Sequence, residues 1–211
     1  MYVFELCEGN IAKQSKAFTL LQSVDVCRQL IQGLQQLEDS NKCHNDLKPE
    51  NVLFNTSDEK YENGDAKVSI KIGDFGTADR SGGTPGWTWP RFLSERKPGR
   101  SDMYSIGLLI LYIMCESREL FYRLRDNYVE SWQPWMSEFR QDPLIELVIE
   151  MMNLKLTAQK CAERWDEISD YVEILTESNL CMDYRIPRFW FDVQDGMAGI
   201  KIANATHLDK F

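Results

Sequence analysis

The most regular pattern of apolar residues lies between Thr19 and Asp39, where they recur every three or four positions. This spacing predicts a long amphipathic helix whose buried face is formed by Leu20, Val24, Cys27, Ile31, Leu34 and Leu37. A second segment, SIGLLILYIMC at 105–115, is apolar nearly throughout and predicts a helix buried on all sides. Ser101-Asp102 in front of it has the residue types that cap helix N-termini.

Short strand-like segments flank the motif-rich part of the chain. NVLF at 51–54 and VSIKIG at 68–73 predict a hairpin with an enlarged polar loop, because an Asn-Gly turn signal lies between them. MYVFELC at 1–7 predicts a further strand that ends in a turn at residues 8–10. Residues 77–100 are rich in Gly, Pro, Ser and Arg and predict irregular structure.

The C-terminal half is predicted to be mainly helical, with helices at 116–125, 144–154 and 165–175. From 181 to 211 no clear period is present, and the sequence predicts no structure there.

Composition and charge narrow the class of protein. The net charge of -9 argues against a nucleic-acid partner, because phosphate binding depends on clustered Lys and Arg. Only two histidines are present, and the six cysteines form no CxxC pair, so a zinc site is not expected. The segment MYVFELCEGN has no basic region followed by an apolar stretch, so we expect no signal peptide there, and no apolar run reaches the roughly 20 residues of a membrane helix. We therefore expect a cytoplasmic protein with no membrane partner.

Four short motifs follow one another in an informative order: HNDLKPEN at 44–51, IGDFG at 72–76, GTPGWTWP at 83–90 and SDMYSIG at 101–107. Together they resemble the C-terminal lobe of a protein kinase. The Lys-Pro-Glu-Asn continuation of the first motif is more similar to serine/threonine kinases than to tyrosine kinases.

This resemblance implies a fold that is mainly α, namely a kinase-like C-terminal lobe with a small β-hairpin at the catalytic loop and a hinge strand. It implies a hinge-like segment at 1–10 and the lobe itself at 11–180. Residues 181–211 would be a C-terminal extension of unknown structure.

The resemblance also implies the residues of a phosphotransfer site that uses ATP and Mg²⁺. Phosphoryl transfer depends mostly on positioning and on neutralising negative charge. Asp46 would orient the acceptor hydroxyl, Lys48 would lie against the transferring phosphate, and Thr84 would bond Asp46 and help to form the substrate-binding loop. Asn51 and Asp74 match the two positions that hold Mg²⁺, which prefers oxygen ligands.

The first residues would bind adenine if they form the kinase hinge. Phe4 would then be the gatekeeper, the Glu5 carbonyl and the Cys7 amide would face the base, and Leu53 would pack beneath the ring. The alternative is an edge strand that binds no ligand.

Three framework residues complete the resemblance. His44 is predicted to be a packed, hydrogen-bonded structural residue with Phe75 beside it. Asp102 matches the buried aspartate that holds the catalytic-loop backbone, and an ordinary N-cap is the alternative role.

The sequence departs from the family pattern at two points within the matched region. Asn45 replaces the arginine that in many kinases pairs with a phosphorylated loop residue, and the loop after Asp74 is short. We therefore expect no activation by phosphorylation of that loop, including at Ser81. Arg91 stands where the family has a glutamate, so Arg164, its expected partner, would lose that ion pair.

A third departure is the lack of a glycine-rich phosphate loop, a Val-Ala-Ile-Lys strand and a glutamate helix. We expect from this that the N-terminal lobe is absent, and that it lies upstream or is supplied by a partner protein in trans. The chain would then be a serine/threonine kinase of protein substrates that is poorly active alone. The alternative is a truncated, non-catalytic pseudokinase that acts as an interaction module. A small-molecule kinase is less favoured, because such relatives usually lack the GTPGW-type substrate loop.

Overall fold

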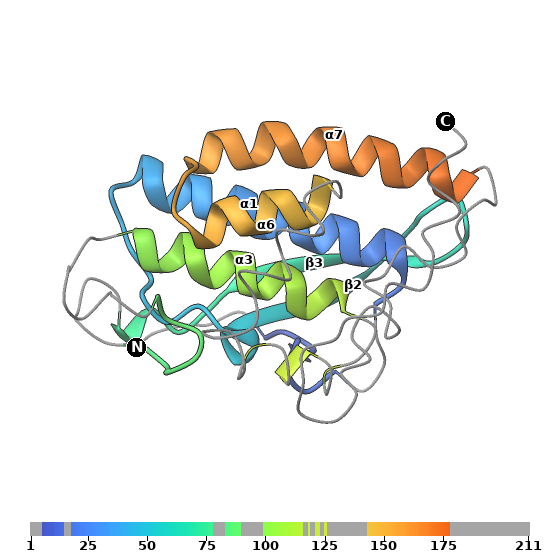
Figure 1. Cartoon of the computed structure of the whole chain (residues 1–211). Helices are drawn as coiled ribbons and strands as arrows, with labels where there is room; N and C mark the ends of the chain where they lie inside the picture. The colour runs from blue at the N-terminus through green and yellow to red at the C-terminus, as the bar shows by residue number, and fades with distance from the viewer. Residues whose placement is uncertain are drawn as a thin grey trace, which may run out of the picture.

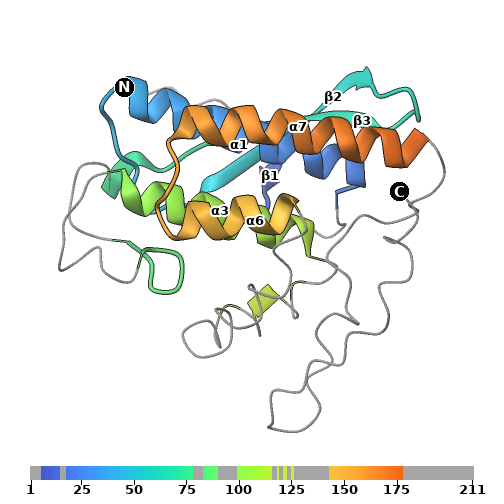
Figure 2. The same cartoon turned by 45° about the horizontal axis from the view of Figure 1, so that its top comes forward.

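The computed structural model describes residues 6–14, 18–77, 83–89, 99–115, 118, 121–122, 125 and 143–177. Four long helices pack together, and a small sheet lies along one of them (Figure 1). Both views show helices α3 and α6 running side by side (Figures 1 and 2). Within the described residues no helix is long and apolar enough to cross a membrane.

Helix α1, Leu20–Asp39, confirms the first predicted helix almost to the residue. Thr19 is its N-cap and forms a capping box with Gln22, in which each side chain accepts a hydrogen bond from the other residue's backbone N–H. The predicted apolar face is the buried one, with Cys27, Leu30 and Leu34 almost inaccessible. The spacing of apolar residues was sufficient to predict this helix, because α1 packs one continuous apolar stripe against its neighbours.

The sheet consists of β1 (Gly9–Asn10), β2 (Val52–Lys60) and β3 (Ala66–Ile72), antiparallel and in that order. Phe54 lies opposite Ile70 in the register of β2 and β3. The predicted hairpin is confirmed, but its loop is smaller than expected because both strands extend into the polar stretch. The turn is closed by the Tyr61 N–H, which donates to the Asp65 carbonyl at 2.8 Å.

The N-terminal segment differs from the prediction. Residues 8–10 were expected to form a turn, yet Gly9 and Asn10 pair with Phe54 and Leu53 of β2. The Glu8 and Ile11 amides donate to β2 carbonyls on either side of this pair. Backbone pairing thus outweighs the local turn preference of Gly and Asn. The strand predicted at 1–7 falls mainly on residues 1–5, which lie outside the described residues.

Glutamine side chains of α1 cover the outer edge of β3. The Gln22 side-chain amide donates to the Ala66 carbonyl at 2.8 Å. Gln29, seven residues further on, donates to the Val68 carbonyl and accepts from the Ile70 N–H. These bonds satisfy groups that an edge strand would otherwise leave unpaired.

Helix α3 (Arg100–Met114) confirms the predicted buried helix, and Ser101 to Met114 are all buried. Its N-cap is Gly99, with φ of 77°, so the predicted cap at Ser101-Asp102 is wrong. The helix begins earlier than the capping residue types indicate, which places Asp102 inside its first turn. The Asp102 side chain therefore does not cap α3 and can accept hydrogen bonds from another segment of the chain.

Two further helices complete the described core. Helix α6 (Pro143–Met152) agrees with the predicted helix at 144–154, whereas α7 (Ala158–Glu177) begins seven residues before the predicted start of 165. The helix predicted at 116–125 and the tail from 181 fall largely or wholly outside the described residues.

The contact of α3 with α6 depends on Gly107. A Cβ atom built there would lie 3.1 Å from Met152 Cγ and 3.4 Å from Met151 Cβ. We expect Gly107→Val to lower the free energy of unfolding by about 1–3 kcal/mol, because the extra methyl groups overpack this contact. Urea denaturation measures the change, and Met152→Ala in the same chain should restore part of it. Unchanged stability of Gly107→Val would contradict this packing.

Candidate active site

The segment between α1 and β2 places Asp46 at the centre of a compact polar site. Asp46 is 8% exposed. Its Oδ1 accepts hydrogen bonds from the Thr84 backbone N–H at 2.8 Å and from Thr84 Oγ1 at 2.6 Å. Its Oδ2 lies 2.9 Å from Lys48 Nζ, which also donates to Thr84 Oγ1 at 2.7 Å. The three residues assigned to catalysis from the sequence are therefore brought together.

Electrostatics keep the Asp46 carboxyl ionised. Burial by itself raises the pKa of Asp46, but hydrogen bonds from Thr84 and Lys48 and the charge of Lys48 outweigh it, so the pKa is lowered. The carboxylate is consequently the stable form at neutral pH.

Asn51 contacts Asp46, and Asp74 follows a residue that is bonded to Asn51. The Asn51 side-chain amide donates to the Asp46 carbonyl at 2.8 Å and approaches Asp46 Oδ2 at 3.4 Å. Asp74 follows Gly73, whose N–H donates to the Asn51 carbonyl at 2.9 Å, and its side chain is exposed. The hairpin thus returns the chain at Asp74 to the neighbourhood of Asn51.

The oxygens offered by this pair fit a hard divalent cation. Asn51 uses its amide nitrogen for Asp46, which leaves its side-chain oxygen available, and Asp74 Oδ1 accepts only a long bond of 3.4 Å from the Gly76 N–H among the described residues. Within the described part of the chain no cluster of three His, Cys, Asp or Glu could hold a metal by itself. A cation here would therefore need further ligands such as phosphate oxygens.

A buried carboxylate on α3 holds the backbone in front of Asp46. Asp102 is fully buried, and its two oxygens accept the His44 and Asn45 backbone N–H groups, each at 2.7 Å. Asn45 has φ of 66°, a conformation that non-glycine residues adopt rarely. Of the two roles considered for Asp102, the structure confirms the one that holds the loop.

His44 is confirmed as a structural residue. It is fully buried, its Nε2 lies 2.8 Å from the Gly73 carbonyl, and the Asp46 N–H donates to its Nδ1 at 3.3 Å. With Nδ1 accepting the Asp46 N–H, the ring N–H is the one on Nε2, which faces the Gly73 carbonyl. The Phe75 ring packs beside it, with centroids 4.7 Å apart, as expected.

The residues assigned to adenine binding are less completely described. Glu5 and Phe4 lie outside the described residues. Cys7 is half-buried beside Asn55, whose side-chain amide approaches its sulfur at 3.8 Å. Leu53 is half-buried in β2, opposite Asn10 of β1. Their role in binding a base stays a prediction.

Arg164 finds partners that sequence reasoning missed. Its guanidinium bonds Glu150 and lies 3.1 Å from Glu146, both on α6. The two glutamates are four residues apart, which places them on one helix face, and this spacing was the available signal. Arg91 and Ser81 lie outside the described residues, so the prediction about loop phosphorylation is not tested.

Comparison with known proteins agrees with this geometry. The family described as "Protein kinase domain" matches residues 1–186. The chain belongs to the protein kinase family. Calcium/calmodulin-dependent protein kinase type 1 of Caenorhabditis elegans is 26% identical to this kinase domain over 201 residues, which cover 92% of the chain and 49% of the relative.

Two further relatives carry related names. A probable serine/threonine-protein kinase of Caenorhabditis elegans is 33% identical over 55% of the chain and 17% of its own length. A probable myosin light chain kinase of Dictyostelium discoideum is 29% identical over 65% of the chain and 40% of its own length. The chain spans about half the length, or less, of the curated relatives it matches.

The prediction of an isolated C-terminal lobe is wrong. The family match begins at residue 1, and the described structure opens with sheet strand β1 followed by helices, so the N-terminal residues belong to the kinase domain. The error came from equating a missing glycine-rich motif with a missing part of the fold. A sheet needs backbone pairing and burial, and neither depends on that motif.

The Asp102 carboxylate is predicted to be essential for stability. Asp102→Ala leaves two buried backbone N–H groups without an acceptor, so we expect a loss of roughly 2–5 kcal/mol in the free energy of unfolding. Asp102→Asn retains one acceptor oxygen and should lose less. Urea denaturation of the parent, Asp102→Asn and Asp102→Ala measures their free energies of unfolding, which should fall in that order. Equal stability of Asp102→Ala and the parent would contradict this role.

The pKa of Asp46 should respond to Thr84. Thr84→Val removes a hydroxyl that lowers the pKa of Asp46, so we expect the carboxyl to titrate at higher pH. Carbon-13 NMR of labelled aspartate measures the midpoint, and Thr84→Ser, which keeps the hydroxyl, is the matched control. A midpoint that stays the same or falls in Thr84→Val would refute the assigned hydrogen bond.

Proposed function

We propose that this domain is a protein serine/threonine kinase that transfers the γ-phosphate of ATP to serine and threonine hydroxyls of protein substrates. The observation that carries the proposal is an ionised, buried Asp46 held by Thr84 and Lys48 in a kinase-family fold. The names of the relatives, which are serine/threonine kinases or Ca²⁺/calmodulin-dependent kinases, support the substrate class.

Asp46 would orient the attacking hydroxyl. Among the described residues its Oδ1 is occupied by Thr84, whereas Oδ2 meets Lys48 and a long contact from Asn51. A carboxylate oxygen has two lone pairs, so Oδ2 can accept a further hydrogen bond from a substrate hydroxyl. The lowered pKa of Asp46 keeps it able to accept that bond at neutral pH.

Lys48 would provide positive charge where the transferred phosphate sits. Its ammonium group is a mobile point charge on a flexible stem, and it bridges Asp46 and Thr84 in the described structure. Thr84 thus links the residue that orients the hydroxyl, the residue that meets the phosphate, and the loop at 83–89 that would receive the substrate.

Asn51 and Asp74 would hold Mg²⁺ together with the phosphates of ATP, because Asn51 bonds Asp46 and the Gly73–Asn51 hydrogen bond returns the chain at Asp74 to Asn51. Bound Mg²⁺-ATP supplies the phosphoryl group and neutralises its developing charge. The backbone of residues near Cys7 and the Leu53 side chain would contact the base, since Cys7 shortly precedes β1 and Leu53 lies on β2, opposite Asn10 of β1.

Phosphotransfer assays test the proposal directly. The chain should label a serine/threonine peptide library when Mg²⁺-ATP is present, and phosphoamino-acid analysis should find phosphoserine or phosphothreonine. Asp46→Asn should lower the rate by roughly 10²–10⁴-fold, because it removes the group that orients the hydroxyl. Asp39→Asn, at the exposed end of α1, is the control and should keep the parent rate.

The other functional classes give different results in the same assay. A non-catalytic interaction module would transfer no phosphate to any substrate and would be indifferent to Asp46→Asn. A small-molecule kinase would label choline or an aminoglycoside in place of the peptides. Labelling on tyrosine alone would contradict the substrate class.

A further inference from the structure

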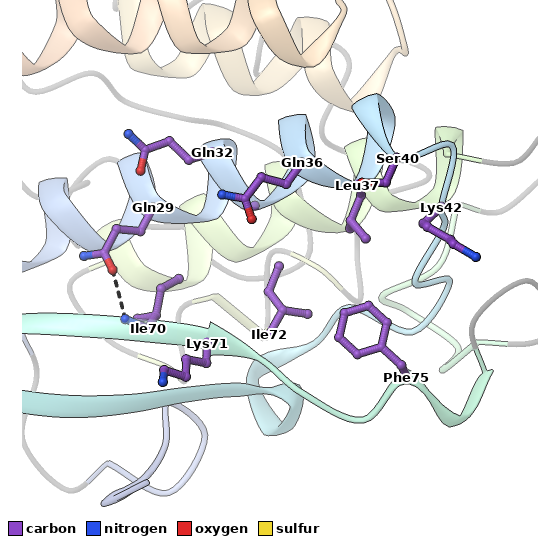
Figure 3. Close-up of a pocket in the computed structure, with 11 residues that line it drawn as sticks. Gln29, Gln32, Gln36, Leu37, Ser40, Lys42, Ile70, Lys71, Ile72 and Phe75 are labelled. Carbon is purple, nitrogen blue, oxygen red and sulfur yellow. Dashed lines mark hydrogen bonds between the residues drawn. The ribbon is translucent and has the colours of Figure 1, made fainter. Parts of the chain in front are cut away.

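Beyond Phe54, the edge of β2 that faces β1 has no strand beside it within the described residues. Strand β1 is two residues long and pairs only with Leu53 and Phe54. The Glu8 N–H, which donates to the Phe54 carbonyl, is the last backbone group of this pairing. The other edge of the hairpin, on β3, is covered by α1, where Gln29 bonds Ile70 (Figure 3). The β2 edge therefore needs a different partner after Phe54.

The Glu8 side chain is that partner. Its Oε1 accepts the Thr56 backbone N–H at 2.7 Å and the Thr56 hydroxyl at 2.6 Å. The Glu8 N–H is also bonded to Asn55 Oδ1 at 2.9 Å. The hydrogen bonds from the Thr56 hydroxyl and backbone lower the pKa of Glu8, so the group is charged at neutral pH. A carboxylate thus joins the segment in front of β1 to β2, and it depends on an unmodified hydroxyl.

The Thr56 hydroxyl is open to a modifying enzyme. Thr56 and Glu8 are both exposed. The regular pairing of β2 with β3 ends at Thr56, because residues 57–59 form a bulge opposite one residue of β3. An enzyme that binds an extended acceptor segment therefore has few backbone bonds to displace after Thr56.

The residues that follow Thr56 indicate which kind of enzyme this is. Asp58 and Glu59 stand two and three positions after it, and both are exposed. Lys67 lies 3.2 Å from Glu59, whose side chain is nonetheless 75% exposed. Negative charge after the acceptor is complementary to a kinase with a basic substrate groove. The segment therefore fits a serine/threonine kinase that selects acceptors followed by acidic residues.

We propose that Thr56 is a phosphorylation site and that its modification releases β1 from β2. The Thr56 oxygen forms a bond to the γ-phosphorus of ATP, the bond from that phosphorus to the ADP oxygen breaks, and the hydroxyl proton passes to a base of the modifying kinase. The phosphate brings a charge of about -1.5 to -2 beside the Glu8 carboxylate and removes the hydroxyl donor. Because like charges repel at this distance, Glu8 leaves the β2 edge.

This release regulates the nucleotide side of the phosphotransfer site, and in that respect it rests on the proposed function. Cys7, whose backbone is proposed to contact the base, directly precedes Glu8. Leu53, on the other side of the base, lies opposite Asn10 of β1. When β1 separates from β2, these two residues lose their fixed spacing. Phosphorylation of Thr56 therefore weakens the binding of ATP.

Mass spectrometry tests the modification. The 211-residue chain carrying Asp46→Asn, which impairs its own phosphotransfer, is incubated with Mg²⁺-ATP and a purified kinase that requires an acidic residue three positions after its acceptor. We expect phosphate on Thr56, and at least about tenfold less of it when Glu59→Lys is added. Ser57→Ala is the matched control and should leave the labelling of Thr56 unchanged.

Hydrogen exchange followed by NMR tests the release. The Glu8 and Ile11 N–H groups donate to β2 carbonyls, so their exchange reports whether β1 is paired. Phosphorylation of Thr56, or Thr56→Glu, should speed the exchange of both about threefold or more. Ser57→Glu adds the same charge one residue away, where the hydroxyl accepts the Glu59 N–H and does not contact Glu8 among the described bonds. It should leave the exchange at the parent rate.

A charge reversal separates repulsion from simple loss of the hydroxyl. Glu8→Lys in the Thr56→Glu chain places opposite charges at the contact. The exchange of the Ile11 N–H should then return to within about twofold of the parent rate. Thr56→Ser, which keeps the hydroxyl, should exchange like the parent.

Three results would overturn the proposal: phosphate on Ser57 or elsewhere with none on Thr56, equal exchange in Thr56→Glu and Ser57→Glu, and no restoration by Glu8→Lys. None of them depends on the activity of this chain. In the peptide assay, Thr56→Glu should raise the KM for ATP with little change in kcat, and an unchanged KM would also count against it. A parent chain that phosphorylates nothing would contradict the proposed function alone, because the labelling and exchange results decide on Thr56 by themselves.

Discussion

Two hydrogen bonds accepted by one buried carboxylate connect the helical core to the loop that carries Asp46. Asp102 sits in the first turn of α3 and takes the backbone N–H groups of His44 and Asn45. Burial raises the pKa of Asp102, and the two amides oppose that rise, so the loop itself makes the carboxylate tolerable in the core. Because Asn45 holds a rare positive φ, the loop needs such an anchor to place Asp46 where it is.

Beyond this anchor, the residues of the candidate active site are held together by hydrogen bonds that they share. Asp46 meets Thr84 through both the backbone and the hydroxyl of Thr84, and Lys48 bonds both of them. Each of the three is bonded to both of the others, so a change in one alters the surroundings of the other two. His44 ties the same loop to Gly73, and through the hairpin to Asp74. Loop, hairpin and substrate-side segment are therefore positioned together.

The edge of the sheet is stabilised by glutamine side chains of α1. Glutamines of α1 take the place of a neighbouring strand along β3, and Gly33 lets the helix come close to Ile72. This protects most of an edge that would otherwise invite pairing with another chain. The protection stops at Gln29, so the remaining edge and the Gln36 amide face a groove with an aromatic floor.

Much of this was predictable from local pattern. The spacing of apolar residues located α1 and α3 because each buries a stripe or a whole surface, and the motif order placed Asp46, Lys48 and Thr84 in one site. What the tertiary structure decided were interactions between segments far apart in the chain. Pairing with β2 turned an expected turn at Gly9 into a strand, and an earlier helix start turned an expected cap at Asp102 into a loop anchor. Local preference records only what a residue favours alone, and here hydrogen bonds to distant backbone outweighed it.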